Sequence, residues 1–202
     1  MKLITTEEVA DKLTRLYLKC SPEETDCYEI IKYGNENIIS SICNFAVVTF
    51  AGLVGGDIFG AWVFFICFAI LRSWMGGYHA DTYLKCNLLI FANVVLIIKI
   101  AEIFPKKIFL QTDIFVLGLT VLEIVFFAPL MNVNKKIRMY SNKRIKIYCT
   151  VVLLNLEILL LVMYKIELYR LSAYVFLSIA STCIAFLVEI FKKTSKVKTY
   201  SR

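Results

Sequence analysis

The chain has 202 residues, of which 59% are hydrophobic, and its mean hydropathy is +0.70. A soluble domain has an apolar share of just under half, so this composition excludes an ordinary soluble protein and predicts an integral helical membrane protein built as one compact domain. The formal charge of +7 is concentrated in a few loops. Such clusters are typical of membrane orientation and of contact with anionic lipid, and we expect no nucleic-acid partner.

The residues before the first long apolar run predict an amphipathic leader. Thr5 and Glu8 have the spacing of a capping box. After them, one helical face collects the apolar residues Val9, Leu13, Leu16, Tyr17 and Cys20. Pro22 marks a second helix start and Gly34 marks a stop. We expect residues 1–37 to lie on the membrane surface or to pack under the bundle; a plain connector helix is the alternative.

Six apolar runs follow, each close to the length that crosses the ~30 Å hydrocarbon core as a helix. The expected spans are 38–55, 58–74, 87–104, 114–131, 147–164 and 171–191. The predicted fold class is therefore all-α, an integral membrane bundle of six transmembrane helices over residues 38–191. A tight helical hairpin is expected at 55–57, and residues 192–202 form a basic tail.

The distribution of Lys and Arg predicts how the bundle is oriented. With the N-terminus in the cytoplasm, 18 of the 23 basic residues fall on the cytoplasmic side and 5 on the other. Because positive charge accumulates in cytoplasmic loops, both termini are expected inside. The polar interruption at residues 72–86 then also faces the cytoplasm.

That interruption holds His79, the one histidine of the chain, and Cys86. Cysteine can act as a nucleophile, and histidine suits proton transfer near neutral pH. On an unbroken helix the two would lie roughly 10 Å apart along the axis, whereas a nucleophile and its base must approach to about 3 Å. We therefore expect a bend at Gly76 and Gly77, His79 in a loop, and Cys86 near the start of the next helix, where the helix N-terminus favours a thiolate.

Arg72, Gly76, Gly77, His79 and Cys86, at these spacings between hydrophobic segments, resemble the accessory gene regulator B (AgrB) family. Its members are membrane cysteine endopeptidases that process quorum-sensing propeptides in Gram-positive bacteria. The resemblance covers most of the chain, with further matches at Tyr33-Gly34 before the first apolar run and Ala128-Pro129 before a basic loop.

The resemblance implies that His79 and Cys86 cleave a propeptide with an acidic C-terminal segment. It implies a thioester acyl-enzyme and cyclisation of the product to a thiolactone or lactone. It further implies a multi-pass protein of the bacterial plasma membrane, with a cytoplasmic active site, and a homodimer.

The supporting residues of such a site are less well defined. Asp81 is close enough in sequence to orient the imidazole of His79, but Ser73, Thr82 or a backbone carbonyl fits that role equally well. Arg72 fits contact with a substrate carboxylate or an oxyanion, or anchoring at the membrane edge. No cofactor and no metal site are expected, because the chain has no C-x-x-C pair and no histidine cluster.

The densest charge in the chain lies at residues 134–146, which hold Lys135, Lys136, Arg138, Lys143 and Arg144. One interpretation is an anchor on acidic lipid headgroups. The other, which the family resemblance adds, is that this loop also holds the acidic end of the propeptide.

Glu123 and Glu157 lie near the middle of their apolar runs, where a charge costs ~3 kcal/mol or more. We expect them to face the interior, either protonated or bonded to a partner such as Asn93 or Asn155. A small transporter that uses these two acids is the alternative function, although no internal repeat or paired broken helices support it. A non-catalytic adaptor that recruits partners through the leader and the basic loop is a third possibility.

Overall fold

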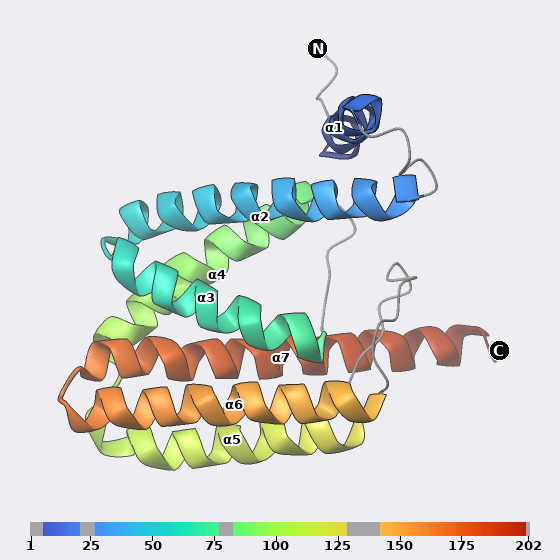
Figure 1. Ribbon diagram of the computed structural model, residues 1–202. Coiled ribbons are helices and arrows are strands. Elements are labelled where there is room, and N and C mark those ends of the chain that lie inside the picture. The colour runs from blue at the N-terminus through green and yellow to red at the C-terminus, as the bar shows by residue number, and fades with distance from the viewer. Residues whose placement is uncertain (1–5, 21–26, 77–82, 129–141, 201–202) are drawn as a thin grey trace.

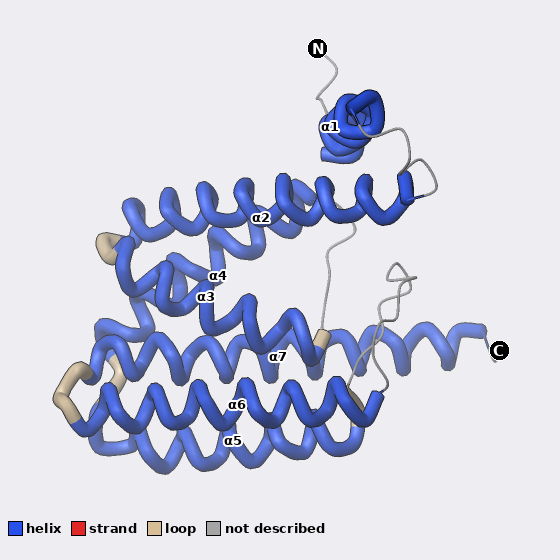
Figure 2. Tube along the Cα trace, in the orientation of Figure 1, coloured by secondary structure: helices blue, strands red, loops and turns tan. Residues whose placement is uncertain are grey.

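The structure, a computed structural model, describes residues 6–20, 27–76, 83–128 and 142–200 (Figure 1). Within these ranges the chain is helical and has no strand (Figure 2). The elements are α1 (Thr6–Cys20), α2 (Tyr28–Gly55), α3 (Ile58–Met75), α4 (Tyr83–Ile103), the 3-10 helix η2 (Lys106–Ile108), α5 (Phe109–Phe126), α6 (Asn142–Lys165) and α7 (Tyr169–Tyr200). Helices α2 to α7 are long and apolar enough to cross a membrane, which confirms the predicted bundle of six spans.

Helix α7 lies at the centre of the bundle, where it packs against α3, α4, α5 and α6. Helix α2 packs on α3 and α4, and it also carries α1. Successive spans run in opposite directions, so the turns after α2, α4 and α6 gather at one end of the molecule (Figure 1). We call this the turn end. The other end, which we call the site end, holds the end of α3, the start of α4 and the start of α6.

The predicted hairpin between the first two spans is present and depends on glycine. Gly56 ends α2 with a φ of 85°, in the left-handed region, and its N–H donates to Gly52 O at 2.9 Å. Asp57 then caps α3, because its Oδ1 accepts a hydrogen bond from Gly60 N at 2.8 Å. A side chain at Gly52 would collide with the backbone of Ile58, so the two helices touch where they meet.

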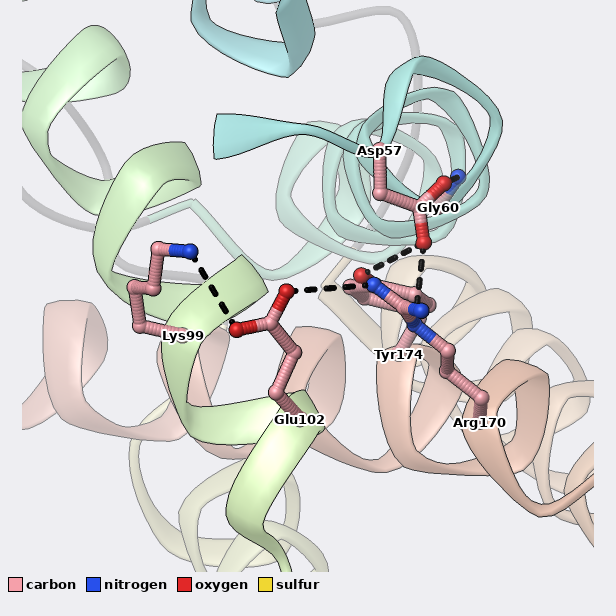
Figure 3. A network of polar contacts seen from close by, with 6 residues as sticks. All are labelled: Asp57, Gly60, Lys99, Glu102, Arg170 and Tyr174. Carbon is pink, nitrogen blue, oxygen red and sulfur yellow. Dashed lines mark hydrogen bonds and ion pairs between the residues drawn. The ribbon is translucent and has the colours of Figure 1, made fainter. Parts of the chain in front are cut away.

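A polar network joins three helices at the turn end (Figure 3). The Arg170 Nε of α7 lies 3.1 Å from Asp57 Oδ2 and its other guanidinium arm lies 3.4 Å from Glu102 Oε1 in α4. The Tyr174 hydroxyl donates to Asp57 Oδ2 at 2.9 Å, and Lys99 pairs with Glu102 at 3.2 Å. Because Tyr174 is fully buried, this network fixes the start of α7 against α3.

Two expected boundaries are wrong. Gly34 does not stop a helix, because α2 runs unbroken from Tyr28 to Gly55. A glycine inside a helix costs only about 1 kcal/mol, and Asn35 next to it is held by a 3.0 Å hydrogen bond to Thr14 of α1. The fourth span, expected at 114–131, is instead α5 at Phe109–Phe126. The helix begins earlier in the sequence because Phe109 is buried and stacks on Tyr164 of α6.

Helix α1 is present, but its apolar stripe does not face the bundle. Ala10 and Thr14 are the residues that α1 buries. Of the apolar stripe, Val9 is half-buried, and Leu13, Leu16, Tyr17 and Cys20 are exposed. The helix therefore docks on α2 through small and polar side chains.

Candidate active site

Cys86 is the fourth residue of α4 and is half-buried. In the first turn of a helix, backbone N–H groups lack intrahelical partners and the helix dipole is positive. The structure thus places the sulfur at the start of a membrane span, at the site end of the bundle (Figure 1).

Arg72 reaches this region from the last turn of α3. Its half-buried guanidinium interacts electrostatically with Cys86 and lies over the ring of Phe68, 5.2 Å from the ring centroid. The two residues lie fourteen positions apart in the chain, and the helix ends that carry them are apart in Figure 1, so this interaction acts over a distance. A permanent cation therefore acts on the thiol through its electric field.

Gly76 ends α3 with a φ of 84°, and its N–H donates to the carbonyl oxygen of Arg72 at 2.9 Å. Glycine adopts this φ without strain, so the chain can leave the helix directly after Met75. The other predicted residues of this segment, Gly77, His79, Asp81 and Thr82, lie outside the described residues.

Two further side chains of α3 have defined contacts. The hydroxyl of Ser73 is exposed and donates to Ile70 O of its own helix at 2.8 Å, so it is directed along α3. The ring of Trp74 packs on that of Tyr148, with centroids 4.9 Å apart, and so joins α3 to α6. Trp74 therefore helps to fix the end of the helix that carries Arg72.

Of the predicted basic contacts, Lys143 and Arg144 lie exposed in the first turn of α6, at the site end. Lys135, Lys136 and Arg138 lie outside the described residues. Next to Cys86 along α4, an apolar groove of about 400 Å³ lies at the contact between α4 and α2; it is lined by Ala46, Val47, Phe50, Leu84, Asn87, Leu88 and Phe91.

The two mid-membrane glutamates are buried as expected, but their partners differ from the expected amides. The Cys183 thiol of α7 donates to Glu123 Oε1 at 3.1 Å. The carboxyl of Glu157 interacts with that of Asp113, which sequence reasoning did not single out. Asn155 instead donates to the carbonyl oxygen of Val151 in its own helix at 2.7 Å.

Among the residues that the structure describes, no group of three or more His, Cys, Asp or Glu side chains could hold a metal ion.

The fold and the site define a multi-pass helical membrane protein with an arginine at the end of one span and a cysteine at the start of the next. The family described as Accessory gene regulator B (AgrB) matches residues 6–191, and the chain belongs to this family. AgrB-like protein 2 of Clostridium perfringens (strain 13 / Type A) is 31% identical over 163 residues, which cover 75% of each chain. No solved structure matches. Family membership supports a part in the processing of accessory gene regulator quorum-sensing peptides.

Proposed function

We propose that this protein is a membrane cysteine endopeptidase that removes the C-terminal part of an autoinducing-peptide precursor and promotes cyclisation of the remainder. The observation that carries the proposal is the position of Cys86, in the first turn of α4 and under the electrostatic influence of Arg72 of α3. A cation and a helix N-terminus are the surroundings that reactive thiols use. Membership of the AgrB family supplies the substrate class.

In the proposed reaction, His79 accepts the proton of the Cys86 thiol, and the thiolate attacks a peptide carbonyl of the precursor. The amine of the C-terminal fragment leaves after His79 returns the proton, and a thioester to Cys86 remains. A thiol or hydroxyl within the substrate then attacks this thioester, which releases a thiolactone or lactone. The exchange needs no ATP, because the thioester conserves the activation of the acyl group, and exclusion of water favours ring closure over hydrolysis.

Arg72 has two roles in this proposal. It stabilises the sulfur anion, and it can hold a substrate carboxylate or the oxyanion of the tetrahedral intermediate. Asp81 is the candidate that orients His79. The basic residues of the loop before α6 are proposed to contact the acidic end of the propeptide or the lipid headgroups: Lys135, Lys136, Arg138, Lys143 and Arg144.

The proposed location is the plasma membrane of a bacterium, with both termini and the site end in the cytoplasm. A peptide made in the cytosol would reach Cys86 directly in this orientation. We include a homodimer in the proposal because the family resemblance implies one.

Co-expression with a propeptide tests the reaction. We expect Cys86→Ser and His79→Ala each to abolish cleavage, because the nucleophile and its base are both required. Cys43→Ser is the matched control, since Cys43 is also half-buried within a membrane helix, α2, and should leave cleavage intact. Cleavage that persists in Cys86→Ser would refute the assignment of the nucleophile.

A second variant distinguishes the proposed peptidase from the alternative, a small transporter. Glu123→Gln removes a mid-membrane acid without changing the volume of the side chain, and under the peptidase proposal it leaves cleavage intact. Loss of cleavage in Glu123→Gln, at normal protein levels, would favour a function that depends on the intramembrane acids.

A further inference from the structure

Two carboxyl groups meet inside the bundle between α5 and α6. Asp113 is 5% exposed and Glu157 is 7% exposed, and their side chains interact. Asp113 lies in the second turn of α5, roughly 6 Å from its start, and therefore towards the turn end of the bundle. Cys86 lies at the opposite end, so the pair is separate from the candidate active site.

Within the described residues, no cation neutralises this pair. Helix α7 packs against both α5 and α6, but the titratable groups of its first half have other partners. Arg170 and Tyr174 bind Asp57 at the turn end, Tyr169 packs on Tyr164 and Lys106, and Cys183 binds Glu123. Of the other titratable groups on α5 and α6, Glu123 faces Cys183, and Cys149 is buried nearer the site end. Tyr148 packs on Trp74, Tyr164 stacks on Phe109, and Lys146 donates to Val125 O. Lys143, Arg144 and Lys165 are exposed. Asp113 and Glu157 therefore have each other as their charged neighbours.

Two adjacent carboxylates cannot both remain ionised in an apolar interior, because neither repulsion nor desolvation is compensated. One proton between them removes the repulsion and lets one carboxyl donate to the other, as in paired catalytic acids. The Oε1 atom of Glu157, in a side chain more than nine-tenths buried, has no hydrogen-bond partner among the described residues. This atom is a free acceptor, which a proton or a water molecule can use.

We propose that Asp113 and Glu157 form an intramembrane proton-binding site that holds one exchangeable proton between the two carboxyl groups. The proton reaches the site from the turn end, because Asp113 lies within two helical turns of it. This site is independent of the proposed peptidase chemistry. It gives the protein a group that can respond to the proton concentration on the side of the membrane opposite Cys86.

Infrared spectroscopy of the full-length protein in liposomes tests the site. At neutral pH we expect the carbonyl band of a protonated carboxyl group that is absent from the double variant Asp113→Asn, Glu157→Gln. Each single substitution should shift this band, because each changes the partner of the remaining carboxyl. Glu102→Gln is the matched control: Glu102 pairs with Lys99 and Arg170, so its loss should leave the band unchanged.

Exchange of the proton is tested on the wild-type protein, so the result does not depend on whether a variant folds. The band should shift after transfer to D2O and should disappear as the pH is raised. The proposal is overturned by a wild-type protein without the band, by a band that neither single substitution moves, or by a band that D2O does not shift. Peptide cleavage is measured separately, so a failure here does not bear on Cys86.

Discussion

At the scale of single residues, Gly60 shows how closely the sequence is matched to the packing. It lies in the first turn of α3, where its N–H donates to Asp57, and the ring of Tyr174 occupies the space that a Cβ would need. Tyr174 in turn donates to Asp57. One missing methyl group thus lets α7 approach α3 and lets the buried hydroxyl reach its acceptor.

We expect Gly60→Ala to lower the thermal stability of the purified protein, by an amount corresponding to about 1–3 kcal/mol, because the added methyl overpacks the contact with Tyr174. Gly118→Ala is the control, since Gly118 lies in α5 with open space around its Cα. Alanine favours a helix by about 1 kcal/mol over glycine, so this variant should be slightly more stable. Equal effects of the two substitutions would contradict the packing described here.

Single residues also differ in how far their positions could be predicted from the sequence. Cys86 could be placed at a helix start because the polar interruption is visible in the sequence. Asp113 could not be identified as an interior residue, because it interrupts the apolar pattern just where the span was expected to begin. The pairing of Arg170 with Asp57 is a contact between distant segments, and no local pattern encodes it.

At the scale of elements, α1 is attached to the bundle through side chains that titrate. The Tyr28 hydroxyl donates to the Asp11 carboxylate, and Arg15 forms an ion pair with the same group at 2.9 Å. The hydrogen bond from Tyr28, with a further contribution from Arg15, holds the pKa of Asp11 below its ordinary value of 3.8. Leu13 and Leu16 lie on the exposed face of the helix, as the predicted contact with the membrane surface requires.

This attachment predicts an acid-induced release of α1. A lowered pKa in the folded state means that the docked form is stabilised above pH 3.8 and loses that stabilisation as the pH falls through the folded value. A spin label on Cys20, the exposed last residue of α1, should therefore become more mobile at a pH below 3.8. Asp11→Asn should abolish the acid transition, because an amide does not titrate there. An unchanged transition in Asp11→Asn would show that another group controls the docking.

At the scale of the whole molecule, the number of spans and their alternation could be predicted from hydropathy, since each span must bury its own backbone hydrogen bonds as a helix. The central position of α7 could not be predicted in this way. Its buried polar residues, among them Ser172, Ser178 and Thr182, look like those of a surface-facing helix until its neighbours are known. Lipid-facing and protein-facing sides are equally apolar in a membrane protein, so hydropathy does not distinguish them.

The orientation predicted from the basic residues can be measured in intact cells. Lys107→Cys places a thiol in η2 at the turn end, while the natural Cys20 lies on α1. A membrane-impermeant maleimide should label Lys107→Cys from outside, and it should label Cys20 only after the cells are permeabilised. The reverse pattern would place the site end and Cys86 outside the cell.

Intact-protein mass spectrometry can detect the covalent bond that we propose between Cys86 and the substrate. The purified protein in liposomes is mixed with a propeptide whose internal cysteine is replaced by alanine, so that the ring cannot close. We expect an adduct with the mass of the N-terminal fragment, which hydroxylamine cleaves and which maps to Cys86. Cleavage of the propeptide with no adduct, or with an adduct on one of the other six cysteines, would contradict the proposal.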